Sequence, residues 1–190
     1  MSAYALLHRS GFRGFLRHLY RIEIAGVERV PPTGGAILVA NHESIWDPFV
    51  LGVATPREIH YLAKAELFRW WPLGALLRSL NAFPVERGSG DLAAISEAAR
   101  RLRRGELLGI FPQGTSKLER QNGWHRGAAR LALATGVPLI PVRLTGTRPL
   151  PWMTHVRIDV GGPIVVERAR PTITMARALT ERLEQAVTAA

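Results

Sequence analysis

The chain has 190 residues and 47% hydrophobic content, which is enough for the core of one domain. It contains no cysteine, so disulfides, thiolate metal sites and cysteine nucleophiles are excluded. The formal net charge of +10 comes almost entirely from arginine and favours an anionic partner, such as a phosphorylated substrate, anionic lipid or nucleic acid.

The first 21 residues predict a basic amphipathic helix. On a helical wheel four arginines lie on one side and a set of apolar residues lies opposite: Arg9, Arg13, Arg17 and Arg21 against Tyr4, Leu7, Phe12, Phe15, Leu16 and Leu19. Such a helix either lies in a lipid interface or packs its apolar stripe on the domain. The segment lacks the features of a secretory signal, and no uncharged apolar run reaches the roughly 18 residues of a spanning helix. We therefore expect peripheral contact with an anionic membrane at its cytoplasmic face.

Residues 22–190 alternate β-type runs with helical segments, so we expect one layered α/β domain with a mixed central sheet flanked by helices. The predicted strands cover residues 22–27, 36–40, 59–63, 83–86, 107–111, 139–144 and 156–160. The predicted helices cover residues 48–53, 91–104, 126–135 and 174–187. Gly105 is expected to end the helix 91–104.

A polar cluster, N-H-E-S-I-W-D at residues 41–47, comes directly after the predicted strand 36–40. A histidine can take a proton from an alcohol near neutral pH when a carboxylate fixes its tautomer and stabilises the imidazolium. His42 and Asp47 are spaced for this pairing. Asp47-Pro48 also resembles a helix start, with Asp47 as the cap and Pro48 at the first position. Taken alone, the pair is more often a capping aspartate and an incidental loop histidine.

A second polar cluster, F-P-Q-G-T-S-K at residues 111–117, follows another apolar strand. Strand ends are where open α/β sheets bind ligands. Gly114 allows backbone N–H groups to approach an anion, Thr115 adds a hydroxyl, and Lys117 with two nearby arginines supplies positive charge. Taken alone, this cluster could also be an ordinary Pro-Gly turn with solvated basic residues.

Together the clusters resemble the motif blocks of the glycerolipid acyltransferase family, which includes 1-acylglycerol-3-phosphate acyltransferase. Asn41-His42 with Asp47 is similar to the family's N-H-x4-D block, and residues 111–116 resemble its F-P-E-G-T-R block. The run F-P-V-E-R at residues 83–87 resembles the second block, and V-P-L-I-P-V at 137–142 resembles the fourth. Lys64 is similar to a family lysine near the acceptor phosphate. The resemblance covers about residues 22–143.

The resemblance implies a glycerolphosphate acyltransferase-like domain at residues 22–190, with His42 as general base and Asp47 orienting it. It implies acyl transfer from acyl-CoA or acyl-carrier protein to the hydroxyl of a lysophospholipid, with 1-acylglycerol-3-phosphate as first choice. No metal and no resident cofactor are expected, because a thiolate is already a competent leaving group. The residues expected to bind substrate are Asn41, Lys64, Arg87, Gln113, Gly114, Thr115, Ser116 and Lys117.

The chain departs from the family pattern in the third block. Gln113 and Ser116 stand where the family has glutamate and arginine. Lys117 can replace the arginine as a point charge but lacks its bidentate fork. The acceptor head group is therefore open, and another lysolipid, such as an acyl-amino acid lipid, is the alternative.

The segment 67–83 points to a lipid substrate independently. It contains seven large apolar residues, interrupted by Arg69, Pro72 and Arg78. The seven are Phe68, Trp70, Trp71, Leu73, Leu76, Leu77 and Leu80. Aromatic rings beside arginine suit a lipid interface, where the segment would guide acyl chains toward His42. The same residues would also suit a helical hairpin buried in the core.

Two functions of other classes remain open from the residues alone. The run G-S-G-D-L-A at 88–93 resembles a dinucleotide fingerprint, but the acid required about 20 residues later is missing. The four arginines within residues 100–104 suggest nucleic-acid binding, but no recognition motif accompanies them and we expect no nucleic-acid partner. A serine hydrolase is disfavoured because no G-x-S-x-G occurs.

Overall fold

The computed structural model describes residues 14, 17–18, 20–79, 81–85, 92–114, 123–148 and 155–190, and at Lys64 and a few other positions it describes the backbone alone. The predicted amphipathic helix 1–21 therefore lies almost entirely outside the described residues, and the division at residue 22 stays a prediction. Within the described ranges, no helix has both the length and the apolar content needed to cross a bilayer.

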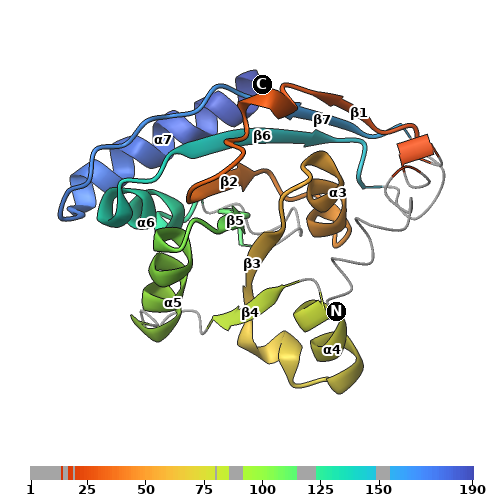
Figure 1. The fold of residues 1–190 in the computed structure, drawn as a ribbon, viewed down its shortest axis with the longest axis horizontal. Coiled ribbons are helices and arrows are strands. Elements are labelled where there is room, and N and C mark those ends of the chain that lie inside the picture. The colour runs from red at the N-terminus through yellow and green to blue at the C-terminus, as the bar shows by residue number, and fades with distance from the viewer. Residues whose placement is uncertain are drawn as a thin grey trace.

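Seven strands form one mixed sheet in the order β1-β7-β6-β2-β5-β3-β4 (Figure 1). Their bounds are Glu23–Ala25 for β1, Ala36–Ala40 for β2, Ile59–Lys64 for β3, Ala82–Val85 for β4, Leu107–Ile110 for β5, Leu139–Thr145 for β6 and Arg157–Val160 for β7. Strands β6, β2, β5, β3 and β4 run parallel, whereas β7 is antiparallel to β6 and β1 follows the direction of β7. The expected mixed sheet is confirmed, and all seven predicted strands are present with small shifts at their ends.

Helices cover both faces of the sheet. Their bounds are Asp47–Ala54 for α3, Trp71–Ser79 for α4, Leu92–Arg103 for α5, Gly127–Thr135 for α6 and Ile173–Ala189 for α7, and 3-10 turns η1 and η2 span Val27–Arg29 and Ala65–Phe68. Helix α3 lies on one face of the sheet and α5, α6 and α7 lie on the other (Figure 1), and a separate core cluster fills each side. Helix α4 lies beside β4 and η2 at one end of the sheet.

Three local expectations are settled by backbone geometry. Gly105 ends α5 as expected, with φ +85° and its N–H donating to Leu102. The predicted strand 22–27 is too long, because the chain turns at Gly26 with φ +75°, where a Cβ atom would lie 2.2 Å from the Val160 carbonyl oxygen. The segment 67–83 is not a helical hairpin but the end of η2, the single helix α4 and the first half of β4.

The central strand β2 is buried on both faces. Ile37 and Val39 belong to one core cluster, while Leu38 and its neighbours of the same parity belong to the other. In the parallel pairing with β5, Val39 lies opposite Ile110. The residues that follow these two strands therefore emerge side by side at the carboxyl edge of the sheet.

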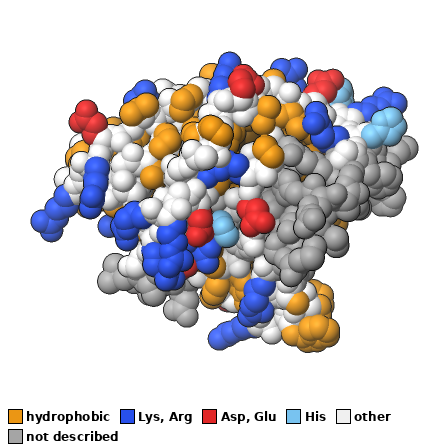
Figure 2. All heavy atoms as spheres, viewed as in Figure 1, with side chains coloured by type: hydrophobic (Ala, Val, Ile, Leu, Met, Phe, Trp, Pro, Cys, Tyr) orange, Lys and Arg blue, Asp and Glu red, His pale blue; other side chains and the backbone are white. Residues whose placement is uncertain are grey.

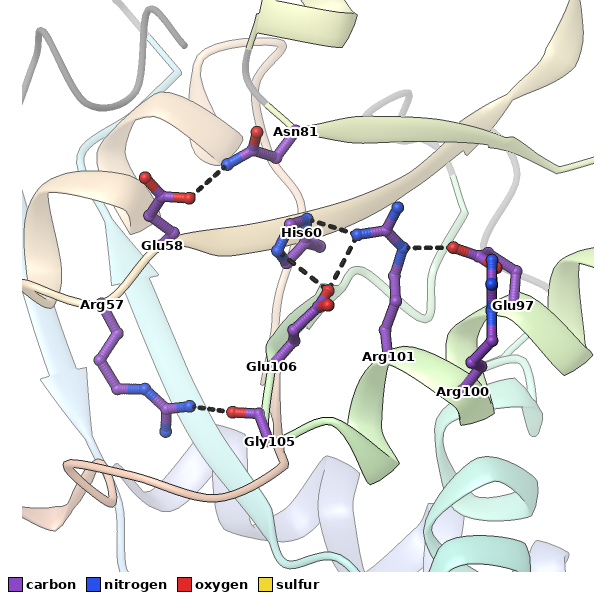
Figure 3. A network of polar contacts seen from close by, with 9 residues as sticks. All are labelled: Arg57, Glu58, His60, Asn81, Glu97, Arg100, Arg101, Gly105 and Glu106. Atoms are coloured by element: carbon purple, nitrogen blue, oxygen red, sulfur yellow. Dashed lines mark hydrogen bonds and ion pairs between the residues drawn. The ribbon is translucent and has the colours of Figure 1, made fainter. Parts of the chain in front are cut away.

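The opposite, amino edge is held by a polar network (Figure 3). Arg101 of α5 donates to Nδ1 of His60 at 3.1 Å and to Glu106 at 2.8 Å, and Nε2 of His60 lies 3.1 Å from Glu106. Burial lowers the pKa of His60, the charge of Glu106 opposes this, and the charge of Arg101 adds to it. Since a neutral imidazole accepts at one ring nitrogen and donates at the other, this geometry fits an uncharged His60.

Candidate active site

The base and carboxylate expected from the sequence meet at the carboxyl end of β2. Nδ1 of His42 lies 2.7 Å from Oδ2 of Asp47. The Asp47 side chain is fully buried, and the His42 side chain is 18% exposed. With Nδ1–H donated to the carboxylate, the lone pair of a neutral ring lies on Nε2, which has no hydrogen-bond partner among the described residues. The pair therefore presents an oriented proton acceptor.

Asp47 does not cap helix α3, contrary to the sequence-based expectation. The helix begins at Asp47 itself, Trp46 occupies the cap position, and no side chain bonds to the helix amides there. Oδ2 of Asp47 instead turns back to the preceding loop, where it accepts from the backbone N–H of Glu43 at 2.6 Å and of Ser44 at 2.8 Å. These two bonds hold the loop against the carboxylate, and the loop in this conformation places the ring of His42 beside the same oxygen.

The second cluster supports His42 from the neighbouring strand. The ring of Phe111 stacks on the imidazole with 4.6 Å between ring centroids and 30° between planes. The side-chain oxygen of Gln113 accepts a hydrogen bond from the backbone N–H of His42. Gly114 adopts φ +72°, and its N–H closes the turn by donating to the carbonyl of Phe111. The structure therefore brings Phe111 and Gln113 against the base.

Tyr61 of β3 extends this support, and sequence reasoning missed it. Its ring lies 6.3 Å from that of Phe111 at 11°, and its hydroxyl donates to the carbonyl of Pro48 at 2.7 Å. Gly109 lies opposite Tyr61 in the parallel β3–β5 pairing and leaves room for the ring. Tyr61, Phe111 and His42 form a continuous set that we call the aromatic stack. No local pattern marks Tyr61, because only the strand register places it there.

Asn41 continues the sheet beyond the end of β2. Its Nδ2 donates to the Leu144 carbonyl at 2.8 Å, and its Oδ1 accepts from the Leu144 N–H at 2.7 Å. The side-chain amide thus replaces the next peptide group of the β2–β6 ladder, while the backbone turns away toward His42. This geometry favours a positioning role for Asn41 over the substrate contact expected from the sequence.

The other predicted substrate residues are only partly described. The backbone of Lys64 ends β3 at the same carboxyl edge, and its side chain lies outside the description. Arg87, Thr115, Ser116 and Lys117 also lie outside the described residues, so their roles stay predictions. Across the ranges that the structure covers, no group of three or more potential metal ligands occurs.

Comparison with known proteins identifies the family. The model of the family described as acyltransferase matches residues 21–145, well over half of the chain and the part that holds His42, Asp47, Phe111 and Gln113. The chain belongs to the acyltransferase family. Family membership confirms the resemblance read from the motif blocks and argues against the oxidoreductase and nucleic-acid alternatives.

The relatives named 1-acyl-sn-glycerol-3-phosphate acyltransferase include proteins of two bacteria. The protein of Bacillus subtilis is 34% identical over 126 residues, which cover 66% of this chain and 63% of the relative. The protein of Streptococcus pneumoniae is 34% identical over 133 residues, which cover 67% of this chain and 49% of the relative. The chain therefore spans between about half and two thirds of the length of these acyltransferases.

A solved structure shares the fold of this acyltransferase-family chain. The crystal structure of the 1-acyl-sn-glycerophosphate acyltransferase of Thermotoga maritima matches with a TM-score of 0.71 at 22% sequence identity. The match covers 98% of this chain and 79% of that structure. The expected acyltransferase-type fold is therefore confirmed for the sheet and its covering helices.

Proposed function

We propose that the chain transfers an acyl group from a thioester donor to the hydroxyl of 1-acylglycerol-3-phosphate. The observation that carries the proposal is the contact of 2.7 Å between Nδ1 of His42 and Asp47 at the end of β2. Two relatives with the corresponding name support the choice of acceptor. Acyl-CoA and acyl-carrier protein are the two donor classes proposed, and both present the same thioester.

The chemistry follows from the oriented imidazole. Nε2 of His42 takes the proton of the acceptor hydroxyl as its oxygen attacks the thioester carbonyl carbon. Asp47 stabilises the imidazolium and keeps the ring in one orientation. Collapse of the tetrahedral intermediate breaks the carbon–sulfur bond, and the imidazolium returns the proton to the leaving thiolate. The products are the acylated lipid and the free thiol, and no covalent enzyme intermediate is needed.

Gln113, which replaces the glutamate of the family motif, affects the choice of acceptor head group. Its amide oxygen accepts from the backbone of His42, a bond that a glutamate could also accept. The amide therefore preserves the support of the loop while it removes one negative charge, and Ser116 removes one positive charge. Because of this double replacement, we propose a phosphate-free lysolipid, such as an acyl-amino acid lipid, as the second candidate acceptor.

The test is the His42→Ala variant, assayed with labelled acyl-CoA and acyl-carrier protein against 1-acylglycerol-3-phosphate and a phosphate-free lysolipid. We expect turnover to fall by about 10²–10⁴-fold while the circular dichroism spectrum stays that of the wild type. His155→Ala is the matched control, since that histidine is exposed and pairs with Glu23 in β1. Wild-type turnover in His42→Ala would refute the base, and a clear preference for the phosphate-free lipid would replace the acceptor.

A further inference from the structure

We propose that this chain docks on an anionic lipid bilayer through an apolar rim at the carboxyl edge of the sheet, with Trp70 and Trp71 entering the interface. The rim consists of Ile45, Trp46, Leu67, Trp70 and Trp71. The proposal rests on the proposed function, because a lysolipid acceptor and its diacyl product both reside in a membrane.

The strongest observation is the exposure of two consecutive tryptophans. Trp70 is 66% exposed and Trp71 is 78% exposed, at the junction of η2 and α4. Figure 2 shows hydrophobic atoms gathered on the projection of the molecule that α4 forms, with arginine or lysine atoms beside them. The same segment does have an inner side, since Phe68 and Leu77 pack against the core. The two indoles therefore lie on an outer side for which the core supplies no contact.

The rim lies at the edge of the sheet that carries the base. Strands β2 and β3 are both parallel to β5, so the segments after them emerge at one edge. The loop after β2 holds His42 and exposes Ile45 and Trp46, and η2 after β3 exposes Leu67. Five of the nine exposed large hydrophobic side chains among the described residues belong to this rim. Exposed apolar surface is thus concentrated in the segments that follow β2 and β3.

The charges beside the rim fit an anionic surface. Four exposed arginines lie in the segments near the rim, with Arg69 after η2, Arg78 in the last turn of α4, Arg126 at the start of α6 and Arg148 after β6. Against them stand exposed Glu66 and the half-buried Glu43, which pairs with Arg148 at 3.6 Å. Tryptophan beside arginine is the composition that settles at the headgroup level of anionic bilayers. A second copy of the chain would bring like positive charges together, which argues against self-association on this face.

Vesicle flotation of the full chain tests the proposal. The Trp70→Ser/Trp71→Ser variant should lose roughly tenfold or more of the partition coefficient on vesicles of phosphatidylcholine and phosphatidylglycerol. The matched control is Val165→Ser/Ile173→Ser, which removes two side chains that are 79% and 75% exposed and outside the rim. Unchanged partition in the tryptophan variant, or an equal loss in the control, would overturn the proposal. A third result would also overturn it: a wild-type dimer in sedimentation that the tryptophan variant no longer forms, while both proteins float with the vesicles equally.

A kinetic comparison separates this proposal from the proposed function. With vesicle-embedded acceptor, the tryptophan variant should show a KM raised about tenfold, a larger rise than with a short-chain acceptor below its micelle concentration. An equal change in KM with both acceptors would place the indoles in acceptor binding and overturn the docking role. If the wild type transfers no acyl group to any acceptor but still floats through its tryptophans, the proposed function fails and the docking surface stands.

Discussion

Replacing Gly109 with alanine tests whether the aromatic stack positions the base. Gly109 lies in β5 opposite Tyr61 of β3. A Cβ atom at this position would lie 2.5 Å from Cε1 and 2.8 Å from Cδ1 of the Tyr61 ring, and 2.9 Å from Cγ2 of Ile59. Because ordinary contact begins near 3.4 Å, the ring must move by roughly 1 Å to admit the methyl group.

The ring of Tyr61 cannot move alone. Its hydroxyl is bonded to the Pro48 carbonyl at 2.7 Å, and its ring lies nearly parallel to Phe111, which stacks on His42 at 4.6 Å. Overpacking of this kind costs about 1–3 kcal/mol, which lowers the Tm of a chain of this size by several degrees. A shift of the base by an ångström lowers kcat by about 100-fold. We therefore expect both quantities to fall in Gly109→Ala.

The assay combines thermal unfolding by circular dichroism with initial rates at saturating donor and acceptor. Gly127→Ala is the control, since a Cβ atom at Gly127 meets nothing within 4 Å, so the change should leave kcat unaltered and should not lower the Tm. A Gly109→Ala protein with the expected drop in Tm and wild-type kcat would refute the role of the aromatic stack. The ring of Tyr61 would then be packing alone.

The remaining predictions concern single polar groups. Asp47→Asn keeps the shape of the side chain but removes the charge that stabilises the imidazolium of His42, so steady-state kcat should fall by about 10²–10⁴-fold; wild-type kcat would contradict this. Asn41→Leu leaves the N–H and carbonyl of Leu144 unpaired, and urea unfolding should show a loss of about 2–4 kcal/mol; a loss under about 1 kcal/mol would show that water replaces both bonds. Burial lowers the pKa of His60, so the folded protein resists its protonation, and the associated stability is intact above the ordinary pKa of 6.5 and lost as pH falls below it. Between pH 7 and pH 5 the wild type should therefore lose more unfolding free energy than His60→Gln, and parallel pH curves would argue against the neutral ring.

The pairing of His42 with Asp47 was predictable because it is local. His42 lies in the loop after a strong apolar strand and Asp47 begins the next helix five positions later, so a short chain segment brings them together. The capping role of Asp47 was wrong for an equally local reason. Two backbone N–H groups of the loop compete for its carboxylate, and spacing alone does not tell which amides win.

The supports of the base were not predictable in the same way. Tyr61 reaches the site through the register of β3 against β5, and Leu144 meets Asn41 through the end of β6 beside β2. A period of two along a strand says which residues share a face, but it does not say which residue of another strand lies opposite. Likewise, the composition of residues 67–83 fitted both a buried hairpin and an exposed interface, and only the structure shows a single helix α4 with Phe68 and Leu77 against the core and Trp70 and Trp71 exposed.

The sequence by itself determined the strands and most helices, the mixed α/β sheet, the family and the pairing of His42 with Asp47. These features depend on hydrophobic periodicity and on groups close together in the chain, which each segment carries independently of its partners. Only the tertiary structure decided how the imidazole is held, what Asn41 bonds to, and which tryptophans face outward. Those contacts join residues far apart in sequence, so they exist only once the strand order and register of the sheet are set.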